Sequence, residues 1–180
     1  MAQQYIRSED NVLPDHLSRI QTSEDYRLNP HVYRAITSSF GACSVDRFAS
    51  SRNALCAQYN SQYWDVGTAG VDAFAQDWRG TRSWCNPPWS LLARLVSFLA
   101  SRPALDAIVL APDWPSALWF PRLRAMAAAE MFIPRRADLF LPGNPSLPAS
   151  LPPPHWNLRA FHVAPRTQKT WPRRPPRMTL

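Results

Sequence analysis

Glycine is scarce in this chain. A long apolar run and an apolar signal region at 1–11 are both absent, which disfavours membrane and secreted proteins. Only 5 of the 180 residues are Gly, against 19 Pro, which predicts rigid irregular segments and leaves no Gly-rich nucleotide-binding fingerprint. No apolar run approaches the roughly 20 residues that cross a bilayer, and the segment 1–11 contains no apolar signal region. We therefore expect a soluble intracellular protein, nuclear or cytoplasmic, that does not enter a membrane.

Cysteine is equally limited. Cys43, Cys56 and Cys85 are odd in number and lack CxxC spacing, which disfavours both a structural zinc site and a disulfide framework. We expect free thiols that pack in the interior, and no metal site.

Acidic residues are absent from the C-terminal segment, where basic charge accumulates. The formal charge is +7, and without the five basic residues of 165–180 it falls to +2. We interpret 165–180 as a basic disordered tail, which is either simply solvated or contacts phosphate groups.

Strand-like and helix-like patterns alternate through 26–164, which we interpret as one α/β domain with an open, mostly parallel sheet and flanking helices. The expected helices cover 26–40, 90–101 and 116–128. In the first of them, Asn29 is a plausible N-cap and Pro30 suits the first turn. The first expected strand begins near Cys43. Four further strands are expected over 83–85, 107–112, 129–134 and 156–163, and we expect the last of these to be antiparallel at the sheet edge. Residues 53–59 are predicted to form a turn or short helix, and 142–154 a Pro-rich loop.

A rigid turn follows the strand 83–85. Pro87 and Pro88 fix φ and lack backbone donors, so neither belongs in a helix interior or a central strand. They place an amide, Asn86, before them and a large ring, Trp89, after them. In α/β sheets, ligands bind at the edge where parallel strands end. This turn is therefore the main candidate site.

Acidic residues near other expected strand ends are the second group of candidates. Asp46 ends the first strand and is followed by the small residues Ala49 and Ser50, a pattern that suits a nucleotide-like cofactor. The alternative is that Asp46 caps a turn. Asp72 and Asp77 lie near apolar residues, where such acids are more often caps or solvated turn residues.

These segments occur together in an order that resembles a known family. The matching segments are Val45-Asp46-x-Phe48-Ala49-Ser50, Asn53-Ala54-Leu55, Asp72-Ala73, Asp77-Trp78 and Trp84-Cys85-Asn86-Pro87-Pro88-Trp89-Ser90. They resemble the phage-type DNA N6-adenine methyltransferases. With the later run 114–121, they resemble in particular the methyltransferase-like domain that follows RNase H in polyproteins of DIRS/Ngaro-type tyrosine-recombinase retrotransposons.

The resemblance implies a Rossmann-like sheet, S-adenosylmethionine as cofactor, and DNA or RNA as partner. Asn86, Pro87, Pro88 and Trp89 would form the catalytic turn, in which Asn86 and the Pro87 carbonyl bind an adenine amino group and Trp89 stacks on the base. The cofactor would face Asp46 and the segment Phe48-Ala49-Ser50, with Asp72 as a second contact. The chain departs from the family in having no glycine at 48–50 and Trp instead of Tyr or Phe at position 89. The alternative is a catalytically inactive nucleic-acid-binding or structural module of a reverse transcriptase/RNase H polyprotein.

The N-terminal segment carries a separate resemblance. Asn11 to Arg19, with Asp15 and Leu17-Ser18-Arg19, resembles the last helix of the retroelement RNase H domain. We interpret 1–22 as a remnant of that helix. Because a two-metal site needs several carboxylates and the partners of Asp15 are missing here, RNase H activity is not expected.

Overall fold

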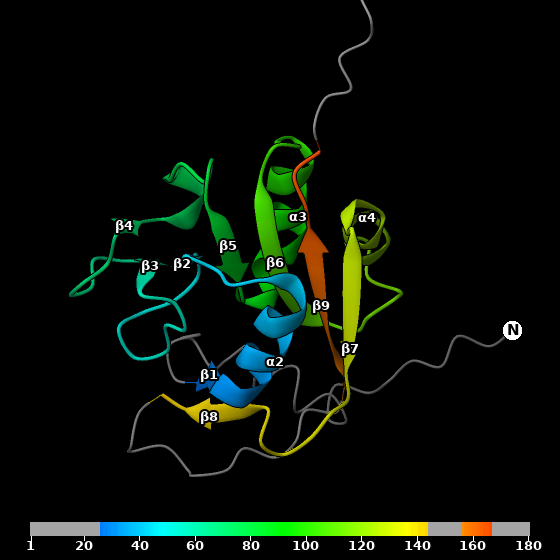
Figure 1. Cartoon of the computed structure of the whole chain (residues 1–180), viewed down its shortest axis with the longest axis horizontal. Coiled ribbons are helices and arrows are strands. Elements are labelled where there is room, and N and C mark those ends of the chain that lie inside the picture. The colour runs from blue at the N-terminus through cyan, green and yellow to red at the C-terminus, as the bar shows by residue number, and fades with distance from the viewer. Residues whose placement is uncertain (1–25, 144–155, 167–180) are drawn as a thin grey trace, which may run out of the picture.

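The computed structural model describes residues 26–143 and 156–166 (Figure 1). The expected RNase H remnant, nearly all of the Pro-rich loop and most of the basic tail lie outside these residues. Within the described part of the chain, no helix is long and apolar enough to cross a membrane.

Seven strands form one sheet in the order β4-β3-β2-β5-β6-β9-β7. β9 pairs antiparallel with both β6 and β7, while β4, β3, β2, β5 and β6 are joined by parallel pairings. The prediction of an open, mostly parallel sheet is thus confirmed. The strands are β2 (Val45–Asp46), β3 (Gln58–Ser61), β4 (Gly70–Val71), β5 (Arg82–Cys85), β6 (Asp106–Pro112), β7 (Ala129–Ile133) and β9 (Leu158–Val163).

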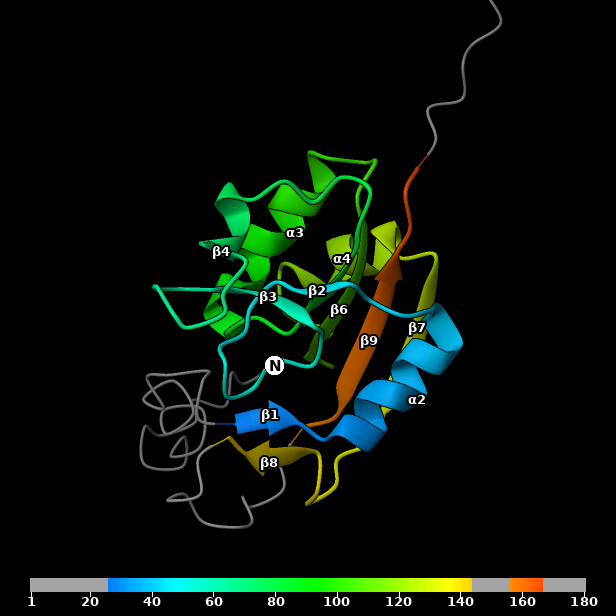
Figure 2. The same cartoon turned by 60° about the vertical axis from the view of Figure 1, so that its left-hand side comes forward.

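Helices cover both faces of this sheet (Figures 1 and 2). α2 (Pro30–Phe40) lies on one face, and α3 (Leu92–Ala100) and α4 (Phe120–Met126) lie on the other. Each face has its own apolar cluster. Because successive strand side chains point to opposite faces, Trp84 packs on the α2 side and Cys85 on the α3 side.

The start of α2 confirms the predicted N-cap and shortens the helix expected over 26–40. The Asn29 side chain accepts a hydrogen bond from the His31 amide at 2.9 Å, and Pro30 occupies the first turn. Both features fix the helix start at Pro30. Residues Tyr26–Leu28 are therefore not helical; they form strand β1, which pairs antiparallel with β8 (Phe140–Pro142) in a separate two-stranded sheet.

Three other predictions also need correction. β9 is antiparallel as expected, but it lies between β6 and β7 and so is not an edge strand. The helix predicted over 116–128 begins only at Phe120, with Pro121 in its first turn. Part of the segment 53–59 belongs to β3, and β4 was not anticipated. These two strands have only four and two residues, too few to show an alternating apolar pattern.

Gly41 provides a test of this architecture. It ends α2 with φ 98° and ψ 157°, a backbone region that is nearly exclusive to glycine, and a Cβ there would overlap the Arg82 guanidinium. That guanidinium donates to the Phe40 carbonyl at 2.7 Å and to Asp106 at 2.9 Å. We expect Gly41→Ala to lower the free energy of unfolding by about 1–3 kcal/mol in urea denaturation. Gly80→Ala, where no heavy atom lies within 4 Å of a new Cβ, should cost less; an equal loss would contradict the steric explanation.

Candidate active site at the carboxyl edge of the sheet

The candidate residues lie at the ends of three of four neighbouring parallel strands, β4, β2 and β5. Asp46 ends β2 opposite Trp84 of β5, and Asn86 follows the end of β5. On the other side of β2, the Ala49 amide donates to Asn60 of β3, and the Asp72 amide donates to Ser61 at 2.9 Å. Asp72 and Asn86 are therefore separated by three strand spacings, about 14 Å. One elongated ligand could contact both.

The turn at Asn86 leaves polar groups without a partner. Cys85 is fully buried, Asn86 is half-buried, and Pro88 leads into a single 3-10 turn, η3 (Trp89–Leu91), that continues into α3. The Leu91 amide donates to the Pro88 carbonyl at 2.8 Å. Within the described residues, neither the Asn86 side chain nor the Pro87 carbonyl makes a hydrogen bond. Neither group is therefore used by the described residues, although Pro87 is buried and Asn86 is half-buried.

Trp89 belongs to a cluster of three tryptophans. Its ring lies edge-to-face against Trp114, with centroids 5.5 Å apart, and against Trp156 at 5.0 Å; the other two rings are 5.6 Å apart. All three are half-buried and come from η3, from the loop after β6 and from the residues before β9. The orientation of the Trp89 ring is thus fixed by its neighbours. No local sequence pattern indicates this cluster, because its members are far apart in the chain.

Asp46 has the turn-capping geometry that was the alternative interpretation. Its carboxylate is 3 % exposed and accepts hydrogen bonds from the Phe48 amide at 3.4 Å and the Leu55 amide at 3.2 Å. Burial raises the pKa of Asp46 to about 7, although the two amide hydrogen bonds act in the opposite direction. Both carboxylate oxygens are occupied within the protein.

The segment after Asp46 has no free backbone donor. Every amide from Arg47 to Leu55 donates a hydrogen bond inside the protein. For example, the Ser50 amide donates to the Asn53 side chain at 2.7 Å, and the Asn53 and Ala54 amides both donate to the Ser50 carbonyl. Ala49 and Ser50 are buried. This loop can offer a ligand a surface, but no main-chain N–H group.

Asp72 is more accessible than Asp46. It is exposed and has φ 56°, which makes it the one non-glycine residue with positive φ among the described residues. One carboxylate oxygen accepts from the Phe74 amide at 3.0 Å, and the other makes no hydrogen bond with the described residues. The Phe74 ring lies 5.5 Å from that of Phe48, and the Arg94 guanidinium lies 4.0 Å from its centroid. Backbone strain of this kind is typical of functional positions.

Asp77 has a structural role. Its carboxylate forms an exposed ion pair with Arg79 at 2.7 Å.

The described residues contain no group of three or more His, Cys, Asp or Glu side chains that could hold a metal ion, and Cys43, Cys56 and Cys85 are free thiols.

Arg47 was not singled out by the sequence analysis. It is 4 % exposed and donates to Ser83 and Asn60, each at 2.9 Å, and to Thr81 at 2.9 Å. Its guanidinium also lies 4.9 Å from the Trp78 ring centroid. Burial lowers its pKa. The only sequence signal was an arginine at the end of a buried strand, where a charged side chain needs several partners.

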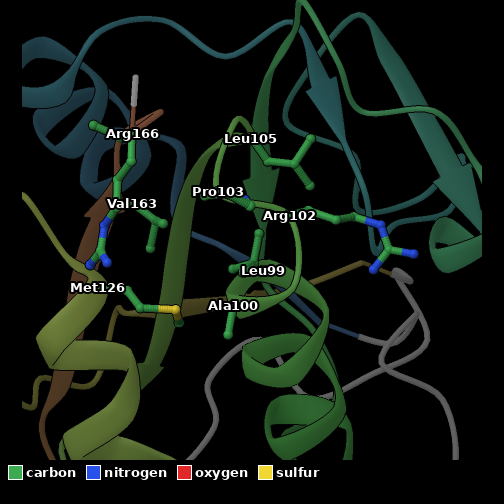
Figure 3. A pocket seen from close by; sticks show the side chains of 9 residues that line it. Leu99, Ala100, Arg102, Pro103, Leu105, Met126, Val163 and Arg166 are labelled. Atoms are coloured by element: carbon green, nitrogen blue, oxygen red, sulfur yellow. The ribbon is translucent and has the colours of Figure 1, made fainter. Parts of the chain in front are cut away.

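A separate cavity of about 30 Å³ lies at the opposite, amino edge of the parallel strands (Figure 3). Leu99, Met126 and Val163 point toward one another around it, whereas Arg102 turns away toward the Phe98 ring. Ligand sites are commonly about 300–1,000 Å³. This cavity is too small for a nucleotide.

The sheet order and this edge define a mixed α/β domain that is compatible with a methyltransferase-like fold. The family model described as DNA N-6-adenine-methyltransferase (Dam) matches residues 18–149, and the chain therefore belongs to that family. The match confirms the resemblance to adenine methyltransferases, and membership implies DNA as the substrate. No curated protein matches the chain significantly.

The burial of Asp46 predicts a pH-dependent stability. Because the folded pKa is raised from 3.8 to about 7, this group's contribution is fully present below about pH 4 and is lost as pH rises to 7. Asp46→Asn removes the ionisation. The unfolding free energy of the variant relative to wild type should therefore increase by about 1.4 kcal/mol per pH unit between pH 4 and 7 in urea denaturation. Asp77→Asn should show no such trend, since its pKa lies near 2. Parallel wild-type and Asp46→Asn curves would contradict the assignment.

Proposed function

We propose that residues 26–164 form a Rossmann-like, S-adenosylmethionine-dependent N6-adenine DNA methyltransferase domain of retroelement origin. The observation that carries this proposal is the Asn86-Pro87-Pro88 turn at the carboxyl end of β5, where the Asn86 side chain and the Pro87 carbonyl make no hydrogen bond with any described residue. The family match to DNA adenine methyltransferases supports it. The retroelement origin rests on the sequence resemblance alone.

The turn is suited to activating an exocyclic amino group. The lone pair of the adenine amino nitrogen is delocalised into the ring, so the nitrogen is a weak nucleophile. The Asn86 Oδ1 atom and the Pro87 carbonyl oxygen would accept its two N–H groups and favour the pyramidal form. Pro88 restricts the backbone that aims these acceptors. Trp89 would contact the base after it leaves the duplex, because a base stacked inside a helix cannot reach such a turn.

The residues near β4 are suited to the adenosyl part of the cofactor. The residues after β2 are less suited to its methionine part. Asp72 offers a free carboxylate oxygen, which could accept from a ribose hydroxyl or an amino group, beside the half-buried rings of Phe48 and Phe74. Ala49 and Ser50 would contribute contact surface only. When bound, the cofactor supplies an electrophilic methyl group, and the protein's contribution is then alignment of the amino nitrogen.

The hydrogen-bonded loop from Arg47 to Leu55 favours a second candidate function, that of a catalytically inactive DNA-binding module. Every amide from Arg47 to Leu55 is already bonded, and Asp46 is buried. The described residues also carry 14 Arg against 8 Asp and Glu, a formal charge of +6, because the net negative segment 1–25 is excluded. The folded part is therefore basic by itself, which favours phosphate binding.

Two measurements separate these functions. We expect wild type to bind S-adenosylmethionine in calorimetry and to methylate adenine in DNA. Asn86→Ala should retain cofactor binding but lose about a hundredfold or more in methyl transfer, because the acceptor for the amino group is removed. Gln58→Ala, an exposed amide at the start of β3, is the matched control and should be unchanged. Transfer that survives Asn86→Ala would contradict the proposed role of the turn.

The second candidate function predicts no heat with S-adenosylmethionine and no transfer, together with salt-dependent DNA binding. Removal of 167–180 retains Arg166, whose guanidinium donates to the Ala125 carbonyl. If the tail contacts phosphates, the deletion should reduce the slope of log affinity against log salt. An unchanged slope would place binding on the folded residues.

A further inference from the structure

The loop between β3 and β4 exposes large apolar side chains. Tyr63 is 70 % exposed, Trp64 78 % and Val66 72 %. These exposed fractions are high for large apolar side chains, which a single domain normally buries at least in part. Because the three lie within four consecutive positions, they form one small patch.

Hydrogen bonds hold this loop in a defined shape. The Asp65 carboxylate accepts from the Ser51 amide at 2.6 Å and from the Ser51 hydroxyl at 3.1 Å. The Tyr59 hydroxyl donates to the Val66 carbonyl, and the Thr68 amide donates to the Asp65 carbonyl at 3.1 Å. The exposed rings therefore stand on a rigid support, so that binding would cost little conformational entropy in the loop backbone.

The loop lies at the same edge of the sheet as the candidate active site. It follows the carboxyl end of β3, and β3 is two strand spacings from β5, about 10 Å. Successive nucleotides along one DNA strand rise about 3.4 Å, so this separation corresponds to about three bases. Figure 2 shows β3 and β4 on the side of the sheet away from β7.

A second protein copy is the less suitable occupant for this patch. A stable protein interface buries about 800 Å² on each partner, whereas an aromatic side chain buries about 150–250 Å². Tyr63, Trp64 and Val66 together fall short of that area. Flat rings on a domain, residues 26–164, with a formal charge of +5 suit the stacked bases and phosphates of single-stranded nucleic acid.

We infer that Tyr63 and Trp64 form a stacking site for unpaired nucleobases that flank the target adenine of the bound DNA strand. This inference rests on the proposed function, in either its catalytic or its DNA-binding form. It assigns the β3–β4 loop to the substrate.

The test uses a labelled single-stranded DNA oligonucleotide, the same oligonucleotide with abasic positions, and fluorescence anisotropy on the full chain. Tyr63→Ser/Trp64→Ser should bind the intact oligonucleotide about tenfold or more weakly than wild type, the loss expected for at least one stacked base. Wild type should discriminate against the abasic oligonucleotide, and the double variant should not. Trp64→Phe, which keeps a stacking ring, should retain most of the affinity.

Phe132→Ser is the matched control, since Phe132 is an aromatic residue that is 49 % exposed on β7 at the other end of the sheet. Urea denaturation should show that both variants remain folded. Equal affinity of the double variant and wild type, or an equal loss in Phe132→Ser, would overturn the inference and leave the proposed function intact. Weaker S-adenosylmethionine binding by the double variant with unchanged DNA affinity would overturn it in favour of a cofactor contact. Failure of wild type to bind the single-stranded oligonucleotide would overturn the inference alone, and failure to bind duplex DNA as well would overturn both.

Discussion

The buried guanidinium of Arg47 is the constraint on which the candidate site depends. It binds side chains on β3 and β5 and the residue before β5, while its own backbone continues β2. A buried cation whose described hydrogen-bond partners are all uncharged needs nearly all of its donors satisfied. The relative positions of β2, β3 and β5 are therefore tied to one side chain, and these strands position the residues that follow them.

The polar groups along the carboxyl edge of the sheet differ in whether they already make hydrogen bonds within the protein. At Asn86 and Asp72, polar groups have no hydrogen-bond partner within the described residues; Asp72 is exposed and Asn86 is half-buried. Between them, the loop from Arg47 to Leu55 satisfies its own amides, which gives a rigid turn without glycine. A glycine-rich loop would let a ligand approach the backbone closely, because glycine has no Cβ. The edge thus leaves more polar groups unused at Asn86 and Asp72 than in the loop between them.

Much of the fold could be predicted from sequence where local signals were strong. Asn29 and Pro30 mark the start of α2, and Pro87 and Pro88 mark the turn between β5 and the helix that follows. The position of β9 between β6 and β7 could not be predicted, because it depends on pairing between distant segments. The same holds for the site. Asn86 was identified from its local pattern, whereas the inward orientation of Asp46 and the grouping of Trp89, Trp114 and Trp156 are products of tertiary packing.

The interior position of β9 has a consequence for synthesis. β6 and β7 emerge from the ribosome first, but the strand that pairs with both of them is the last one described in the chain. Until residues 158–163 are made, two strands have unsatisfied edges, and exposed edges promote pairing between molecules. The domain therefore closes only after β9 has been translated, and a premature stop before residue 158 would yield an aggregation-prone fragment instead of a smaller folded domain.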